Sequence, residues 1–222
     1  MQVVGHRGAK GLAPENTMLA IEKAIEYKVS IVEVDVRVTK DGVPILFHNR
    51  KLKINHEPPL VIAKTDYAHL KHYKDDLTTL EQAIAVTAHK TRLCMEIKRG
   101  VELAHIIKLV SAQLDRGESP VDFMFSSFSY ASLKQLKAIL PQVGVAVNES
   151  WSGVRAGYRC RKLQGEYICL NYRFLWRGYL KLASRGGQHI YGFTINEPKI
   201  ANRLSKHGLA GVITDYPDRF LN

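Results

Sequence analysis

The chain has 222 residues, of which 45% are hydrophobic and 24% charged, and this composition excludes an intrinsically disordered protein. No apolar run is long enough to cross a bilayer, no secretory signal opens the sequence, and the three cysteines indicate free thiols, so we expect a cytoplasmic protein. The net charge of +11 favours an anionic partner, which leaves nucleic acid, a membrane surface and a small phosphorylated molecule open.

Short apolar runs alternate with amphipathic segments, and neither a linker nor a sequence repeat interrupts them. The segment 16–28 is typical, because Met18, Ile21 and Ile25 fall on one helical face. In chain order we expect strand 2–5, helix 16–28, strand 30–36, helix 79–90, strand 92–97, helix 101–116, strand 122–128, helix 129–140, and strands 143–147, 167–170, 190–195 and 210–215. Eight strands that alternate with helices predict an α/β fold, the (β/α)8 TIM barrel, as a single domain over residues 1–222.

One further strand-like run, 43–48, follows the second barrel strand too closely for a parallel crossover. The dipeptide Asp41-Gly42 is a strong hairpin signal, so we expect a β-hairpin arm over residues 31–48. If these two residues form the turn, Asp35 lies opposite His48 and Arg37 lies opposite Leu46.

Three acidic residues stand at the ends of expected barrel strands. Glu33 and Asp35 share one face of the second strand because side chains two residues apart point the same way, and Glu96 ends the third barrel strand. Two buried carboxylates so close together are costly unless a cation lies between them. The set predicts an oxygen-rich site for Mg²⁺ or Ca²⁺.

Two histidines and two cations are expected beside these acids. His6 closes the first strand and His48 lies across the hairpin, a pair suited to general acid and base catalysis near neutral pH. Arg7 and Lys98 also follow strand ends, and both can bind phosphate oxygens. Together with the metal site, they indicate a phosphate ester as the ligand.

The excess of positive charge is concentrated near the carboxyl end of the chain. From Arg155 to Arg185 there are eight Lys or Arg residues and one acid, Glu166, interleaved with aromatic residues. Such a stretch can stack nucleic-acid bases or contact an anionic membrane weakly, but the solvated face of two helices is the interpretation that we favour.

The sequence resembles the glycerophosphodiester phosphodiesterases over nearly its whole length. The resemblance rests on seven motifs in order: "HRG" (6–8), "APENT" (13–17), "VEVDVRVTKDG" (32–42) leading to "FH" (47–48), "MEIK" (95–98), "SSF" (126–128), "FTIN" (193–196) and "ITDYP" (213–217). Each motif is weak alone, but their order at the ends of the expected strands is specific.

The resemblance implies a role for each of these residues. Its metal ligands correspond to Glu33, Asp35 and Glu96, its acid–base pair to His6 and His48, its phosphate contacts to Arg7 and Lys98, and its glycerol-side aromatic, usually Trp, to Phe193. Asn16 is interpreted as a cap of the first helix that also holds the loop. The implied reaction is metal-dependent hydrolysis of a small glycerophosphodiester to sn-glycerol 3-phosphate and an alcohol.

The chain departs from the family pattern after His48, where it reads "NRKLKINHEPPL", and the segment 49–79 is shorter than usual, so we expect a reduced cap insertion there. These departures bear on which leaving alcohol the protein accepts and not on the type of reaction. Two alternatives remain at this level: lysophospholipase D-like hydrolysis of lipids at a membrane, and an inactive barrel that binds anions or nucleic acid. The sequence does not indicate the oligomeric state.

Overall fold

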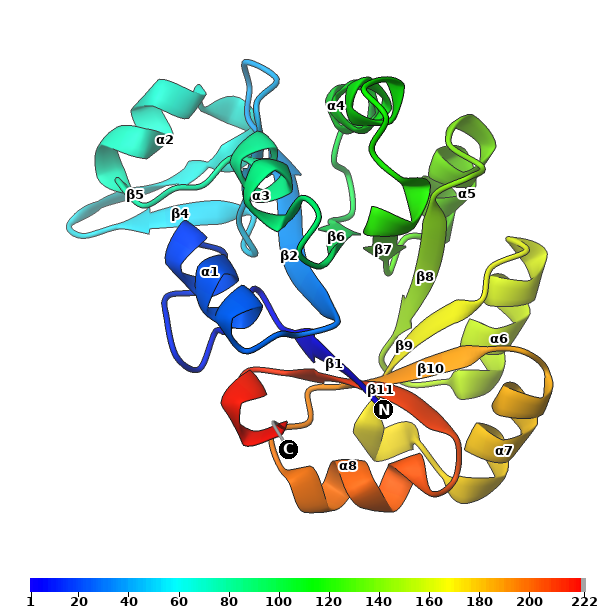
Figure 1. Ribbon diagram of the computed structural model, residues 1–222. Helices are drawn as coiled ribbons and strands as arrows, with labels where there is room; N and C mark the ends of the chain where they lie inside the picture. Colours follow the sequence, from blue (N-terminus) through cyan, green and yellow to red (C-terminus); the bar gives the residue numbers. More distant parts are fainter. Residues whose placement is uncertain (221–222) are drawn as a thin grey trace.

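The parallel strands close into a barrel around which the helices are arranged, as the computed structural model of residues 1–220 shows (Figure 1). Within those residues the barrel has eight strands: β1 (Gln2–Gly5), β2 (Ile31–Val38), β6 (Arg92–Ile97), β7 (Phe123–Ser127), β8 (Gly144–Glu149), β9 (Tyr167–Asn171), β10 (His189–Phe193) and β11 (Leu209–Thr214). β1 pairs in parallel with both β11 and β2, which closes the circle. The predicted (β/α)8 fold is therefore confirmed.

Helices follow the strands on the outside of the barrel. They are α1 (Met18–Glu26), α3 (Leu80–Thr87), α4 (Ala104–Asp115), α5 (Tyr130–Ile139), α6 (Gly153–Lys162), α7 (Arg177–Arg185) and α8 (Pro198–Ser205). Several begin at a side-chain cap; for example, the Thr17 hydroxyl accepts from the backbone N–H of Ala20 at 3.2 Å. No helix of the described chain is long and apolar enough to cross a membrane.

Alternation along each strand divides the apolar residues between two layers. Val32, Val34 and Val36 of β2 point outward and pack under the helices in the larger core. Ile31 points inward and belongs to a ring to which every barrel strand contributes one residue: Val4, Ile31, Cys94, Met124, Ala146, Cys169, Tyr191 and Ile213. This ring fills the middle of the barrel, so the residues two positions further along each strand lie above it, at the carboxyl ends of the strands.

The hairpin arm is present, but its predicted register is wrong by one residue. β2 pairs antiparallel with β3 (Pro44–Leu46), so that Arg37 lies opposite Ile45, and the carbonyl of Asp35 accepts from the N–H of Phe47 at 2.9 Å. The turn has three residues rather than two, because Thr39 N–H bonds to Val43 O at 3.0 Å across Lys40, Asp41 and Gly42. Gly42 has φ of +83°, the left-handed conformation that closes such three-residue loops.

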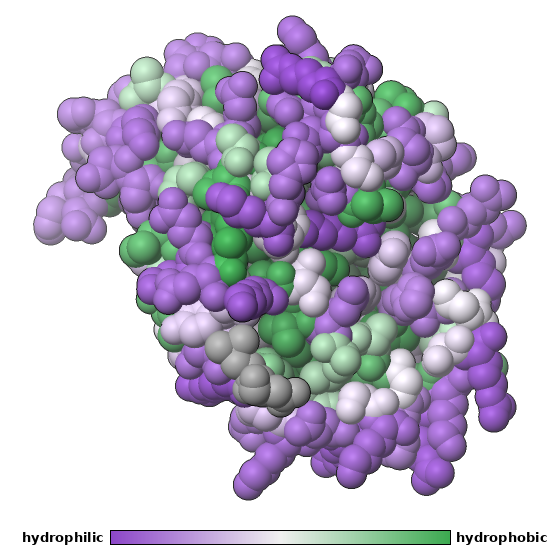
Figure 2. All heavy atoms as spheres, viewed as in Figure 1, coloured by the Kyte–Doolittle hydropathy of each residue, from purple (hydrophilic) through white to green (hydrophobic). Residues whose placement is uncertain are grey.

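The segment after the hairpin forms a small lobe on the outside of the barrel (Figure 1). It contains the two-stranded sheet of β4 (Lys51–Ile54) and β5 (Glu57–Val61), followed by α2 (Tyr67–Tyr73). Leu52, Ile62 and Leu70 bury this lobe against Ile45 of the hairpin. Across the face in Figure 2, hydrophilic side chains dominate the outline, and hydrophobic ones show chiefly toward the middle.

Candidate active site

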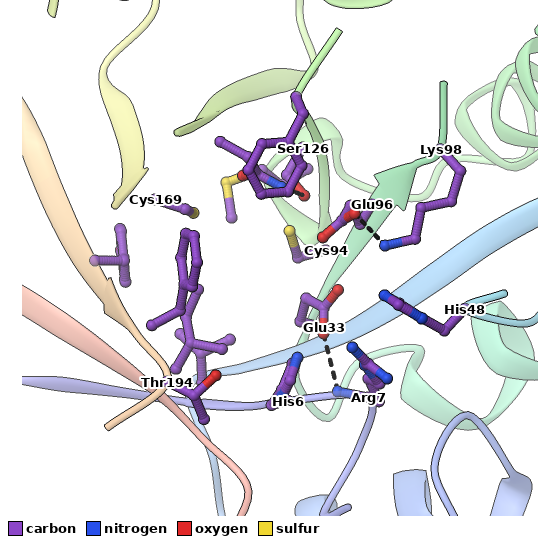
Figure 3. A pocket seen from close by; sticks show the side chains of 17 residues that line it. His6, Arg7, Glu33, His48, Cys94, Glu96, Lys98, Ser126, Cys169 and Thr194 are labelled. Atoms are coloured by element: carbon purple, nitrogen blue, oxygen red, sulfur yellow. Dashed lines mark hydrogen bonds and ion pairs between the residues drawn. The ribbon is translucent and has the colours of Figure 1, made fainter. Parts of the chain in front are cut away.

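The layer above the apolar ring is polar and surrounds a cavity of about 290 Å³. Residues two positions beyond the ring lie at its wall: His6, Glu33, Glu96, Ser126, Asn148 and Phe193. Arg7, His48 and Lys98 reach the same cavity from strand ends and the hairpin, as Figure 3 shows. The structure thus places seven of the eight predicted site residues on one cavity, and the eighth, Asp35, lies beside it.

The turn "GHRG" forms part of the border of this cavity. Arg7 has φ of +53° and Gly8 has φ of +81°, which bends the chain so that the N–H of Arg7 donates to Glu33 Oε2 at 2.9 Å. A side chain at position 8 would place its Cβ 2.5 Å from the backbone of Ala20 in α1, so only glycine fits there. The turn therefore brings a backbone donor and two polar side chains to the acidic cluster.

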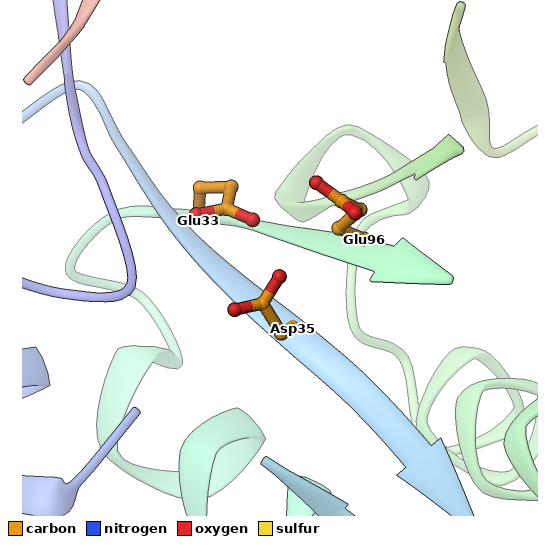
Figure 4. Close-up of side chains that lie close together, drawn as sticks. All are labelled: Glu33, Asp35 and Glu96. Carbon is orange, nitrogen blue, oxygen red and sulfur yellow. The ribbon is translucent and has the colours of Figure 1, made fainter. Parts of the chain in front are cut away.

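The three carboxylates face one another from β2 and β6 (Figure 4). One oxygen from each of Glu33, Asp35 and Glu96 lies within 4.8 Å of the others. Burial raises the pKa of Glu33 well above its ordinary value, and the charges of Asp35 and Glu96 raise it further. Oε1 of Glu33 is buried, and no hydrogen-bond partner exists for it in the described part of the chain. The cluster thus keeps a buried carboxyl oxygen without a partner in this part of the chain, and it disfavours the charged form of Glu33.

Asp35 is the best partnered of the three acids. Lys98 Nζ lies 2.5 Å from Oδ1 and Arg7 Nε lies 3.1 Å from Oδ2, and Lys98 also contacts Glu96. Burial alone would raise the pKa of Asp35, but Lys98 and Arg7 outweigh burial and hold that pKa below its ordinary value. Asp35 is therefore a fixed negative charge, whereas Glu33 forms no ion pair in the described part of the chain and its neutral form is favoured.

The sequence led us to expect that Asn16 caps the first helix, but the structure shows that it does not. Thr17 is the cap, and Asn16 instead grips Asp35 twice: its Nδ2 donates to Oδ2 at 2.9 Å and its Oδ1 accepts from the N–H of Asp35 at 3.0 Å. Asn16 has φ of +60°, which asparagine tolerates better than most residues. The "PENT" motif thus orients a member of the acidic cluster.

His6 is oriented by a residue that the sequence analysis did not single out, Asp215. Nδ1 of His6 lies 2.6 Å from Oδ1 of Asp215, whose other oxygen accepts from Asn196 Nδ2 at 3.0 Å. Although burial opposes ionisation, the bonds from His6 and Asn196 lower the pKa of Asp215 to about 2. An ionised carboxylate only accepts, so Nδ1 carries the proton, and Nε2 is the ring nitrogen left for the cavity.

His48 is held through its backbone. Its carbonyl oxygen accepts two hydrogen bonds from Arg37, at 3.0 Å from Nε and 2.7 Å from Nη2, and its Nδ1 lies 3.0 Å from Oδ1 of Asn49. Burial lowers the pKa of His48, and the charges of Lys98 and Arg7 lower it further against the opposing effect of Asp35. The neutral imidazole is therefore favoured at this position.

The opposite wall of the cavity is aromatic. Phe193 at the end of β10 meets Phe128 edge to face, with ring centroids 6.1 Å apart. Ser126 and Asn148 lie nearby, where Asn148 Nδ2 is 3.4 Å from Ser126 Oγ. The buried Oδ1 of Asn148 has no partner within residues 1–220, so it can accept a hydrogen bond from a ligand.

The fold and the site define a class: a (β/α)8 barrel with an acidic cluster and two histidines at the carboxyl ends of its strands. The sequence profile of the Glycerophosphoryl diester phosphodiesterase family matches residues 6–219. The chain belongs to this family and is a phosphoric diester hydrolase.

Individual relatives agree with this assignment. A glycerophosphodiester phosphodiesterase of Bacillus subtilis is 27% identical over 98% of this chain and 84% of its own. The structure of an Oleispira antarctica phosphodiesterase in complex with the product sn-glycerol-3-phosphate has a TM-score of 0.86, with 30% identity over 99% of this chain and 94% of that chain. The glycerophosphodiester phosphodiesterase of Thermotoga maritima has a TM-score of 0.80, with 26% identity over 99% of this chain and 96% of that chain.

Proposed function

We propose that the protein hydrolyses glycerophosphodiesters to sn-glycerol 3-phosphate and a free alcohol with the help of a bound Mg²⁺ or Ca²⁺. The observation that carries the proposal is the meeting of three carboxylates and two histidines at one place, where all but Asp35 line the cavity and Asp35 lies beside it. The names of the relatives and the product in the Oleispira antarctica complex support the choice of substrate.

The acidic cluster fits a hard divalent cation. Its donors are all carboxylate oxygens, and Glu33 keeps a buried oxygen without a partner among the described residues. Glu33, Asp35 and Glu96 would hold the ion, with Asn16 and the backbone of Arg7 orienting two of them. When bound, the ion supplies positive charge that polarises the phosphoryl group and offsets charge that grows on its oxygens.

Arg7 and Lys98 would bind the phosphate from the rim of the cavity. Arg7 is fixed by Glu15 at 2.8 Å as well as by Asp35, and Lys98 lies between Asp35 and Glu96. Both side chains are therefore held in place before substrate arrives, which reduces the entropic cost of binding.

The two histidines would divide the proton transfers between them. His48, which is kept neutral, would take the proton of the nucleophile, either water or the glycerol 2-hydroxyl. His6, whose Nδ1 is held by Asp215, would give a proton from Nε2 to the oxygen of the leaving alcohol as the P–O bond breaks. With the glycerol hydroxyl as nucleophile, water would open the resulting cyclic phosphate.

The test is release of glycerol 3-phosphate from glycerophosphocholine, glycerophosphoethanolamine and glycerophosphoinositol, first by metal-stripped protein and then with Mg²⁺ or Ca²⁺ restored. We expect turnover with metal only, and a loss of about 100-fold or more in kcat for His6→Ala and for His48→Ala. His72→Ala, on the exposed face of α2, is the matched control. Normal turnover by both site variants would reject the mechanism. Absence of turnover of all three substrates by the unmodified protein would reject the proposed function.

We also propose that one rim of the barrel contacts anionic membranes weakly. Trp151 and Trp176, 71% and 65% exposed, follow β8 and β9 at the end of the barrel that holds the site. Exposed Arg173 and Arg177 accompany them, and Trp151 packs on Phe174 with centroids 5.5 Å apart. Exposed tryptophans beside cations are typical of membrane-surface contacts.

Sedimentation with phosphatidylglycerol-containing vesicles tests this contact, with pure phosphatidylcholine vesicles for comparison. We expect binding to the anionic vesicles that Trp151→Ala/Trp176→Ala weakens and Leu182→Ala, an equally exposed apolar residue on α7, does not. No binding by the unmodified protein would end this part of the proposal.

We also propose that the protein acts in the cytoplasm. Cys94, Cys160 and Cys169 are all unpaired and buried, which suits a reducing compartment. Cell fractionation tests the placement, and activity recovered outside the cytoplasmic fraction would overturn it.

A further inference from the structure

A second cavity, of about 540 Å³, lies beside the catalytic one. Three chain segments pass from the first cavity to the second: β2 from Glu33 to Arg37, the segment after β3 from His48 to Arg50, and the segment after β6 from Lys98 to Arg99. His48 lines the first cavity and Arg37 lines the second, and Arg37 donates two hydrogen bonds to the carbonyl of His48. A group bound in the second cavity would therefore lie next to the histidine that borders the reacting phosphate.

The charges of the second cavity are strongly unbalanced. Its lining includes Arg37, Arg50, Arg99 and Lys40, against one acid, Glu102. Lys40 is 3.7 Å from Asp66. In the part of the chain that the structure describes, none of the three arginines forms an ion pair. Like charges gathered in a concave site repel one another, and a bound anion would relieve that repulsion.

The geometry limits what kind of anion the second cavity can bind. Arg37 shares the face of β2 that carries Glu33 and Asp35, and it lies two residues beyond Asp35, about 7 Å along the strand. An alcohol the size of a sugar ring that extends from the reacting phosphate past this end of β2 would bring a second anionic group to these cations. Val38 and Ile62 provide an apolar surface between the cations for such a ring. Arginine binds phosphate through two parallel hydrogen bonds, so a phosphate monoester matches the set best.

We propose that this cavity binds a phosphate monoester carried by the leaving alcohol, and that the protein therefore prefers glycerophosphodiesters of phosphorylated polyols. The inference rests on the proposed function and specifies its substrate class. The same cations disfavour choline and ethanolamine, whose positive charge would be repelled.

The first arm of the test compares glycerophosphoinositol with glycerophosphoinositol 4-phosphate at saturating metal. We expect kcat/KM to be about tenfold higher or more for the phosphorylated substrate, and the preference to shrink as salt is raised. In Arg50→Gln/Arg99→Gln the ratio falls toward one. Arg161→Gln/Arg185→Gln, which removes two exposed charges from α6 and α7, keeps the wild-type ratio. Equal kcat/KM values for the two substrates in the unmodified protein would overturn the proposal.

The second arm measures binding by calorimetry, without turnover, using inositol 4-phosphate, inositol and inorganic phosphate. We expect inositol 4-phosphate to bind the unmodified protein and to bind Arg50→Gln/Arg99→Gln about tenfold more weakly. This result would support the site even if neither diester were hydrolysed, because absence of hydrolysis would reject only the proposed function. Inorganic phosphate that binds as tightly as inositol 4-phosphate would show a site for free anions and overturn the substrate assignment. Unchanged binding in the double variant would overturn the proposal as well.

Discussion

Nδ1 of His6 lies 2.6 Å from Oδ1 of Asp215, and this contact joins two residues that are 209 positions apart in the chain. It links the end of β1 to the end of β11, the strands whose pairing closes the barrel. Asn196 holds both the side chain and the backbone of Asp215, because its Nδ2 donates to Oδ2 and its Oδ1 accepts from the backbone N–H of Asp215. The orientation of the His6 ring therefore depends on closure of the fold.

Asp215→Asn tests that dependence. The amide cannot stabilise a protonated imidazole, and it can present an N–H where His6 needs an acceptor. We expect kcat to fall about 100-fold while KM changes little, because the effect acts on proton transfer and not on binding of the diester. Steady-state kinetics with glycerophosphodiesters measure it; a kcat within twofold of the unmodified protein would show that the pair is structural only.

Acid unfolding gives a second test of the same carboxylate. The folded protein lowers the pKa of Asp215 from its ordinary 3.8 to about 2. Ionised Asp215 therefore stabilises the fold above pH 4, roughly, and this contribution is lost as pH falls through about 2. We expect the free energy of unfolding to decrease more between pH 5 and pH 2 in the unmodified protein than in Asp215→Asn, as followed by urea titration. If the free energy of unfolding fell equally with pH in both proteins, the lowered pKa of Asp215 would be contradicted.

Asn16 offers a test of how Asp35 is held. Asn16→Ala removes both hydrogen bonds to Asp35 and leaves buried groups unpaired, so we expect about 2 kcal/mol less stability and weaker binding of the metal. Asn16→Gly measures the contribution of the side-chain hydrogen bonds to stability apart from that of the backbone conformation, because glycine adopts the φ of +60° without strain. Equal stability of Asn16→Gly and the unmodified protein would mean that the hydrogen bonds contribute nothing.

The thiols are expected to be inert in the folded protein. Burial raises the pKa of Cys160 to about 11 and that of Cys94 to about 12, and it raises the pKa of Cys169 as well. Reaction with a disulfide reagent requires an accessible thiolate. We expect negligible labelling of the native protein and full labelling in denaturant; rapid native labelling would place a thiol at the surface.

The barrel was predictable because its strands are short, apolar and regularly separated by amphipathic segments. β6 was predicted with its observed bounds, 92–97. The register of the hairpin could not be predicted, because it depends on whether Gly42 occupies the second or the third position of the turn. Local backbone angles decide that position, together with contacts such as the hydrogen bond from the N–H of Tyr67 to Asp41 at 3.0 Å.

The acidic cluster was predictable for a different reason. Charged residues in an otherwise apolar barrel strand, as Glu33 and Asp35 are in β2, need a compensating partner. The supporting residues carry no such signal. Asn16 stands in a sequence that reads as a helix start, and Thr17 next to it takes the cap. Asp215 reaches His6 only when the barrel closes, so its role follows from the fold and not from local sequence.

The most direct test of the account is a metal titration of stripped protein in which bound Mn²⁺ or Ca²⁺ and the release of glycerol 3-phosphate are measured together. The account predicts that binding and turnover rise in parallel, and that Glu33→Gln/Glu96→Gln loses both while it stays folded by circular dichroism. Full turnover by the metal-free protein, or unchanged metal binding by the double variant, would contradict it.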